Sequence, residues 1–176
     1  TGRLIDYELW DPISDPVTQE LIRRGDTMGC FYVESPATRL LLKKLWTTMP
    51  QARRAHADVF EYLVVVSSII RPAANVYADD FIRRSHGHPY RSWHPLLDEV
   101  LAETHGIMVY QEDVMKVAVA LGGFSVHDGD QLRKILSKKH KERQLRDYQR
   151  QFYEGAAARD VHRSTTDKIW AMIMSF

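Results

Sequence analysis

Positive charge is concentrated in residues 128–150, which read DGDQLRKILSKKHKERQLRDYQR. Between Arg133 and Arg150 only Glu142 and Asp147 oppose a series of lysines and arginines, namely Arg133, Lys134, Lys138, Lys139, Lys141, Arg143, Arg146 and Arg150. Arginine offers bidentate contacts to phosphate oxygens, and lysine offers a mobile point charge. The stretch therefore allows two interpretations, a phosphate-binding site or an ordinary solvated helix face.

Histidines and the single cysteine are the other residue types that could carry chemistry. Four histidines lie close in the sequence, His86, His88, His94 and His105, but their spacing matches no zinc motif. Cys30 has no second cysteine with which to bind a metal. His94 precedes a proline and His105 precedes a glycine, which are capping and turn positions. We expect structural histidines, no metal site, and a buried, unreactive Cys30.

Paired acids occur at three places: Asp79 with Asp80, Glu112 with Asp113, and Asp128 with Asp130. A two-metal site needs carboxylates that converge from separate elements, whereas adjacent acids on one helix point apart. Asp128-Gly129-Asp130 is typical of a turn that leads into a helix, where acids favour the helix dipole. No phosphate-cradling glycine motif is present. We therefore expect no catalytic residue here.

Helix signals recur along the chain and predict the elements that must position these residues. Asp15-Pro16 and Ser35-Pro36 each place a capping residue before a proline. Hydrophobic spacing predicts helices over residues 17–24, 37–46, 57–70, 77–87, 95–106 and 111–122. We expect Gly25, Gly106 and the pair Gly122-Gly123 to end three of them.

The basic stretch itself divides into two predicted helices. Leu132, Ile135 and Leu136 form the apolar face of the first, and we expect it to end near Lys138 or Lys139. Leu145, Tyr148 and Phe152 restart the pattern in a second helix, with its end expected near Gly155. Residues 28–34 and 107–110 are candidates for short strands or extended segments. The fold class is thus mainly α, an irregular helical domain with one or two short strands or extended segments.

Composition limits the class of protein. Of the 176 residues 44% are hydrophobic, which is ordinary for a globular protein with a core, and the net charge is +1. A nucleic-acid role must therefore rest on local clustering of charge. The longest apolar run, residues 63–66, is too short to span a bilayer, so we expect no membrane partner. A lone cysteine suits the reducing cytoplasm.

Several segments, taken in order, resemble a known family. They are LIRRGDTMGCFYVES, VVVSSIIRP, DFIRRSHG, HPLLDEVLAETHGIMVYQEDVMKVAVALGGFS, LRKILSKK and FYEGA. They are similar to successive blocks of the α subunit of bacterial DNA polymerase III, the C-family replicative polymerase, from about Asp11 onward. The most specific are HGIMVYQEDVM, residues 105–115, against YGIxxYQEQVM, and LRKILSKK, residues 132–139, against LRRAMGKK.

The resemblance implies that the chain is the fingers portion of a DNA polymerase. We expect one domain over residues 1–176, with residues 1–15 leading in from the palm and the chain cut after Phe176. In this family the aspartates that hold two magnesium ions lie in the palm, outside this chain. The fragment alone is therefore expected to be inactive, with template-primer DNA, dNTP and other replicase subunits as partners of the full-length protein.

The family motifs carry over to named positions. Arg133 and Lys134 occupy the two-arginine position of LRRAMGKK, and Lys138 and Lys139 match its two lysines, so the resemblance implies that they bind the nucleotide triphosphate or the nearby nucleic-acid backbone. Arg71 matches the arginine of the family's RPGP turn. Tyr110 and Gln111 match its YQE, which implies a nucleotide-facing position.

Departures from the family pattern indicate a divergent branch. Lys134 replaces an arginine, Ser137 replaces a glycine, and Tyr32 stands where the family has glutamine. Ile135-Leu136 replaces Ala-Met, Ala73-Ala74 replaces Gly-Pro, and residues 46–57, WTTMPQARRAHA, include extra sequence. Two other hypotheses stay open: a non-catalytic helical protein-interaction module with a solvated basic face, and a histidine-dependent metalloenzyme.

Overall fold

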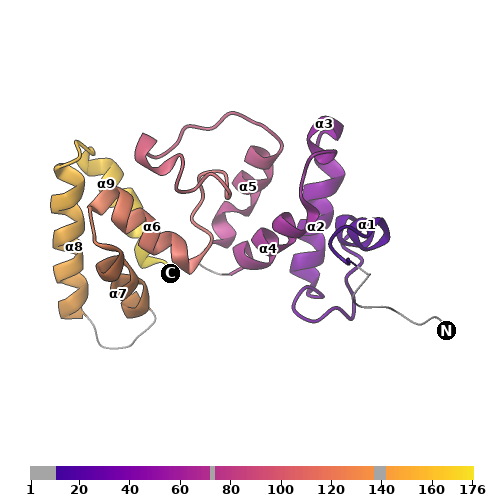
Figure 1. Ribbon diagram of the computed structural model, residues 1–176, viewed down its shortest axis with the longest axis horizontal. Coiled ribbons are helices and arrows are strands. Elements are labelled where there is room, and N and C mark those ends of the chain that lie inside the picture. The colour runs from indigo at the N-terminus through magenta and orange to yellow at the C-terminus, as the bar shows by residue number, and fades with distance from the viewer. Residues whose placement is uncertain (1–10, 72–73, 137–141) are drawn as a thin grey trace. The chain divides into compact units, whose positions relative to one another are not determined.

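The computed structural model describes residues 11–71, 74–136 and 142–176. These residues form α-helices, two short 3-10 helices and turns, and none of them lies in a β-strand. The mainly α prediction is confirmed. The chain divides into two compact units, Thr1–His88 and Pro89–Phe176 (Figure 1). The expectation of one domain over the whole chain stays a prediction.

The first unit is built from five α-helices in its described part. They are α1 (Pro16–Arg24), α2 (Pro36–Thr48), α3 (Gln51–Arg54), α4 (Val59–Ile69) and α5 (Ala78–Ser85), with a 3-10 turn at Asn75–Tyr77. Their core contains the fully buried Leu42, Leu45, Trp46, Ile69 and Phe81. The four-residue α3 buries none of its side chains, so the core forms without it.

Local capping sets where these helices begin and end. The Asp15 carboxylate accepts a hydrogen bond from the Thr18 amide at 2.7 Å, and Ser35 accepts one from the Thr38 amide at 3.1 Å. Gly25 ends α1 with a φ of 67°, and a side chain there would collide with the Arg39 carbonyl of α2. The predicted caps at Asp15, Ser35 and Gly25 are confirmed.

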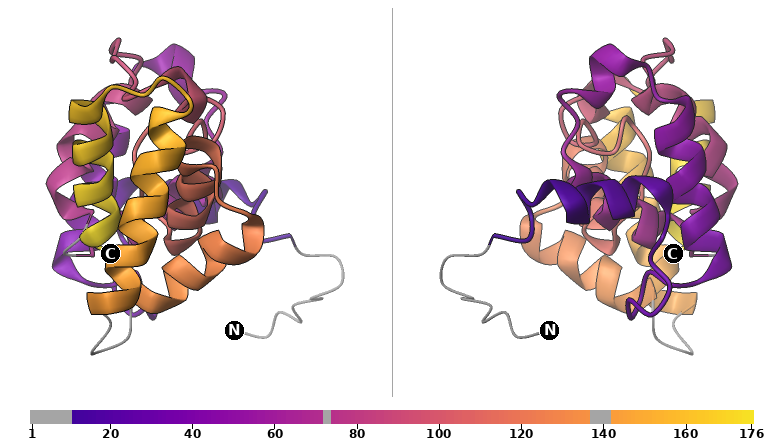
Figure 2. Two further views of the ribbon diagram at one scale, coloured as in Figure 1. Left: turned by 90° about the vertical axis from the view of Figure 1, so that its left-hand side faces the viewer. Right: turned by 90° about the vertical axis from the view of Figure 1, so that its right-hand side faces the viewer.

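The second unit places α6 (Gln111–Gly122) at its centre. α6 packs against α7 (Val126–Leu136) and α8 (Glu142–Ala157), and α8 also lies beside α9 (Arg163–Met174), as Figure 2 shows. Gly123 ends α6 with a φ of 66°, as predicted. The core is contributed by all four helices and by the segment before them, including Leu101, Leu121, Leu132, Phe152 and Ile169.

Glycines allow two close helix contacts in this unit. A Cβ on Gly155 would overlap the Gly122 carbonyl, so α8 crosses α6 backbone to backbone. A Cβ on Gly129 would lie 3.0 Å from Met115 Cγ and 3.2 Å from the Met115 carbonyl oxygen, which marks the contact of α7 with α6. Gly155 lies in the last turn of α8, which ends at Ala157, so the prediction that this helix ends near Gly155 is confirmed.

Residues 95–106 do not form the predicted helix. Only Pro95–Leu97 is helical, as a 3-10 turn, and turns follow it to Gly106. The Thr104 hydroxyl lies 2.6 Å from the Ile107 carbonyl oxygen and 3.3 Å from the Leu101 carbonyl oxygen, and the shorter contact closes a turn at the end of this segment. Gly106, expected to cap a helix, occupies a turn with a φ of 77°.

The two strand candidates also differ from expectation. Residues 28–34 form turns closed by a 2.6 Å hydrogen bond from the Thr27 hydroxyl to the Val33 carbonyl. Tyr32 there has a φ of 75°, and Cys30 is exposed rather than buried. Residues 107–109 are buried, as predicted for this segment, but they lead into the N-cap of α6 without forming a strand.

Candidate functional site

The α6–α7 hairpin brings the basic end of α7 to the first turn of α6. Arg133, in the last turn of α7, places its Nη1 atom 3.9 Å from Oε1 of Glu112, the second residue of α6. Tyr110 is the N-cap of this helix and Gln111 its exposed first residue. Arg133, Lys134, Tyr110 and Gln111, which the sequence singled out, therefore belong to one end of one hairpin.

Asp130 organises the two cations. Its Oδ1 atom accepts hydrogen bonds from Arg133 Nη2 at 2.7 Å and Arg133 Nε at 3.1 Å, and its Oδ2 atom lies 2.6 Å from Lys134 Nζ. The Lys134 ammonium and then the Arg133 guanidinium hold the pKa of Asp130 below its ordinary value. We call Glu112, Asp130, Arg133 and Lys134 the basic cluster.

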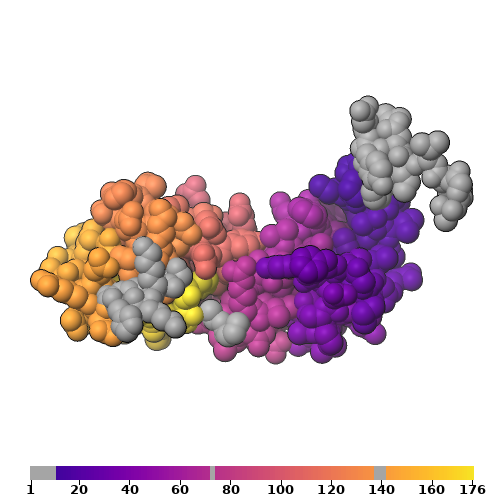
Figure 3. All heavy atoms as spheres, turned by 90° about the horizontal axis from the view of Figure 1, so that it is seen from below, coloured from indigo at the N-terminus to yellow at the C-terminus, as the bar shows by residue number. Residues whose placement is uncertain are grey.

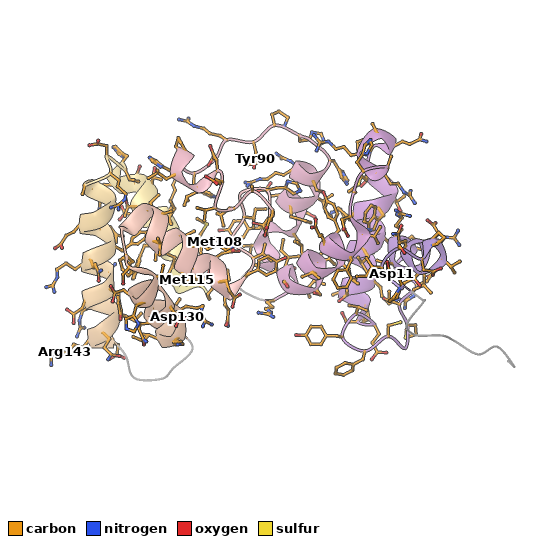
Figure 4. The ribbon with its side chains drawn as sticks, in the orientation of Figure 1. Asp11, Tyr90, Met108, Met115, Asp130 and Arg143 are labelled. Atoms are coloured by element: carbon orange, nitrogen blue, oxygen red, sulfur yellow. The ribbon has the colours of Figure 1, made fainter. Side chains whose placement is uncertain are left out.

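The sequence suggested that Asp130 belongs to a turn before the helix. This prediction is wrong, because Asp130 lies within α7. α7 begins at Val126, and the Ser125 hydroxyl accepts a hydrogen bond from the Asp128 amide at 3.1 Å. Asp128 lies in the first turn, as expected of a capping acid, while Asp130 is helical (Figure 4). The spacing of Asp130 to Arg133 and Lys134, three and four residues, is the signal in the sequence that indicates this pairing.

Asp113 fixes the start of α6, where Tyr110 and Gln111 lie. Its buried carboxylate accepts hydrogen bonds from the backbone amides of Val109 at 2.9 Å and Tyr110 at 2.8 Å. Burial raises the pKa of Asp113, and the two amide hydrogen bonds oppose that rise. The carboxylate thus holds the segment before α6 against the helix and sets the position of the hairpin's end.

The remaining predicted residues lie in other parts of the chain. Arg71 follows α4 in the first unit and is exposed. Lys138 and Lys139 lie outside the described residues. Arg143, Arg146 and Arg150 are exposed on α8, where Arg150 lies 3.4 Å from Asp147, and Figure 3 shows α7 and α8 (orange) at the surface of this unit.

The described residues contain no group of three or more histidine, cysteine, aspartate or glutamate side chains that could hold a metal ion. His86 Nε2 lies 2.9 Å from the Leu45 carbonyl oxygen, and His94 accepts a hydrogen bond from the Leu96 amide at 3.3 Å. His105 has a φ of 53° in a turn. These three histidines therefore have structural positions. No helix in the described ranges is long and apolar enough to cross a membrane.

Comparison with known proteins gives the family. The model of the bacterial DNA polymerase III alpha subunit finger domain matches residues 5–160. The chain belongs to this finger-domain family. Its helices α1 to α8, and with them the basic cluster, lie within the matched range, so the hairpin that carries Arg133 is part of the finger domain.

Relatives of the finger domain include three polymerase subunits. The chain is 35% identical to DNA polymerase III subunit alpha of Neisseria meningitidis serogroup B over 176 residues, which is all of this chain and 14% of that protein. It is 35% identical to the Aquifex aeolicus subunit over 94% of the chain and 14% of the relative. It is 38% identical to the Chlamydia pneumoniae subunit over 73% of the chain and 10% of the relative. The chain thus spans 14% or less of the length of each of these three relatives.

Proposed function

We propose that this finger domain helps a replicative DNA polymerase bind the incoming dNTP and the template-primer, with the basic cluster contacting phosphate. The observation that carries the proposal is the 3.9 Å approach of Arg133 to the first turn of α6. It brings Glu112 of one specific family motif, residues 105–115, close to Arg133 of the other, residues 132–139. The polymerase names of the relatives support the same function.

The geometry of Arg133 suits a phosphate ligand. Asp130 occupies the Nε and Nη2 atoms of its guanidinium, which fixes the side chain on the helix surface. Among the described residues, the remaining nitrogen, Nη1, reaches only Glu112, a carboxylate with 63% of its side chain exposed. An exposed ion pair of this kind contributes about 0–1 kcal/mol. A phosphate oxygen can therefore replace Glu112 on Arg133 at small cost.

In the reaction proposed for the whole enzyme, the primer 3′-hydroxyl attacks the α-phosphorus of the dNTP and pyrophosphate leaves. Cations placed on the triphosphate stabilise the charge of the transition state. We assign this positioning role to Arg133 and Lys134, and to Lys138, Lys139 and Arg71 by the family pattern, with Tyr110 and Gln111 facing the nucleotide. Magnesium would be held by palm residues outside the chain and would neutralise phosphate charge there.

This assignment predicts which charges matter for binding. Changing Arg133 and Lys134 together to glutamine should weaken binding of primer-template DNA or dNTP about a hundredfold or more, since hydrogen bonds to charged groups contribute about 1.5–3 kcal/mol each and two are removed. The slope of log Kd against log salt should fall by about one for each phosphate that the variant no longer binds. Fluorescence anisotropy of labelled DNA over a salt series measures both.

Arg146→Gln with Arg150→Gln is the matched control pair, because it also removes two positive charges and both residues are exposed on α8. We expect it to leave both the affinity and the slope nearly unchanged. Equal losses of affinity in the control and the cluster variant would contradict the assignment. Binding that is absent even at low salt would instead support a non-catalytic protein-interaction module.

We further propose that the chain has no polymerase activity by itself and works in the cytoplasm within a larger replicase. The carboxylates of the described residues support the first point, because those near the basic cluster cap α6 or pair with Arg133 and Lys134. A primer-extension assay with the purified chain, dNTPs and magnesium should show no product. Template-dependent extension would overturn this proposal.

A further inference from the structure

A second concentration of positive charge lies in the first unit, in a pocket of about 390 Å³. The pocket is formed by α1, α2 and α3, which Figure 1 labels. Its lining includes four cations, Arg23, Arg24, Lys43 and Arg54. Because three helices contribute them, the cluster is a product of tertiary structure and not of one charged helix face.

The charge of this pocket is not balanced. Glu20 is shared by three guanidinium groups, at 2.9 Å from Arg24, 3.5 Å from Arg54 and 4.0 Å from Arg23. Asp26 is the second acid of the lining, so four cations face two carboxylates. Lys43 makes no ion pair with a carboxylate in the described part of the chain. The pocket therefore carries an excess of two positive charges.

Two buried N–H donors at the pocket wall also lack acceptors. The Arg23 guanidinium lies over the Trp46 ring, with Cζ 5.3 Å from the ring centroid. Arg23 Nε and Trp46 Nε1 are both buried, and neither finds a hydrogen-bond partner among the described residues. Buried donors are normally paired, so these two donors are exceptions among the residues that line the pocket.

We propose that this pocket binds a phosphate group, carried by a nucleic-acid strand or by a free nucleotide. Phosphate offers several oxygens at once to arginine forks, which a single carboxylate does not. The volume lies at the lower end of small-ligand sites, so it fits a phosphate with part of its carrier. Arg54, which belongs to α3, adds a third guanidinium group to the lining.

The proposal does not rest on the role of Arg133 and Lys134, which lie in the other unit. It is tested on the full chain carrying Arg133→Gln and Lys134→Gln, so that the basic cluster contributes nothing. Into this background the pair Lys43→Gln and Arg54→Gln is introduced. Lys44→Gln with Arg83→Gln serves as the control pair, since it removes the same charge from exposed positions of the same unit that do not line the pocket.

The probes are inorganic tripolyphosphate and a fluorescent single-stranded oligodeoxynucleotide. We expect the pocket pair to weaken phosphate binding about tenfold or more, as for removal of charged hydrogen bonds, and the control pair to change it about twofold at most. If the oligodeoxynucleotide binds and tripolyphosphate displaces it, the pocket takes a phosphate of a nucleic-acid strand. If tripolyphosphate binds and the oligodeoxynucleotide does not, the pocket takes the phosphate of a free nucleotide.

Three outcomes would overturn the phosphate site: unchanged binding in the pocket pair, equal losses of affinity in both pairs, or a polyglutamate peptide that binds as tightly as tripolyphosphate. Thermal melting of each variant checks folding. If the pocket pair unfolds, Arg54→Lys replaces it. That variant keeps the charge but loses the arginine fork, and it should still weaken binding severalfold, while an unchanged affinity would reject the site.

Discussion

Gly155→Ala should destabilise the protein by about 3 kcal/mol, despite the higher helix propensity of alanine. The added Cβ would overlap the carbonyl group of Gly122, which belongs to the backbone of α6 and cannot rotate away as a side chain can. α6 and α8 must then separate, and Phe152 and Ala156 would pack less closely in the core. Urea unfolding measures the change as a shift in midpoint at constant m-value.

Two further variants test whether the loss of stability depends on how closely the two helices approach. Gly129→Ala should cost less, because its Cβ meets Met115 Cγ at 3.0 Å and the Met115 carbonyl oxygen at 3.2 Å, distances that a small shift relieves. Gln151→Ala, exposed on α8, should change stability by about 0.5 kcal/mol or less. A Gly155→Ala protein as stable as the wild type would show that α8 does not cross α6 at this point.

Asp113→Ala is expected to cost about 2–4 kcal/mol. The change leaves the amides of Val109 and Tyr110 without their acceptor, and an unsatisfied buried donor costs about 1–3 kcal/mol. Because Tyr110 begins α6, hydrogen exchange at residues 109–113 should accelerate more than exchange in α9. Uniform acceleration across the unit would argue that Asp113 stabilises the whole fold without fixing this end of the hairpin.

Asp113→Asn is the matched test of charge. It retains an acceptor oxygen for the two amides and removes the carboxylate whose burial raises the pKa, so we expect a loss of stability below about 1 kcal/mol. The folded wild type binds a proton more tightly at Asp113 than the unfolded chain does. Wild-type stability should therefore rise relative to Asp113→Asn as the pH falls through the raised pKa, and the opposite trend would contradict the burial argument.

Local chemistry makes much of the fold predictable. Asp15 and Ser35 cap helices through hydrogen bonds to residues three positions away, and Gly25 and Gly123 end helices in a conformation that glycine favours. The sequence therefore contains their boundaries. The place of Gly155 is not predictable in this way, because its role depends on Gly122 of another helix. Residues 95–106 have apolar residues at helical spacing, but after Leu97 they form turns, which that spacing does not distinguish from a helix.

The candidate site is predictable in part for a different reason. Family motifs point to Arg133 and Lys134, and the spacing to Asp130 is available in the sequence, but the approach of Arg133 to Glu112 depends on how the hairpin closes. The pocket around Glu20 was not predicted, since its cations come from three separate helices. The roles of Arg71, Lys138 and Lys139 stay predictions.

The absence of buried side chains in α3 has an evolutionary consequence. Changes in α3 therefore act mainly on surface contacts, such as the 3.5 Å ion pair between Arg54 and Glu20, and leave the buried side chains in place. Because Arg54 lies in α3, substitutions there could change the charge of the pocket around Glu20 while the core of the first unit stays the same. Natural selection can therefore adjust this surface independently of the hairpin that carries the family motifs.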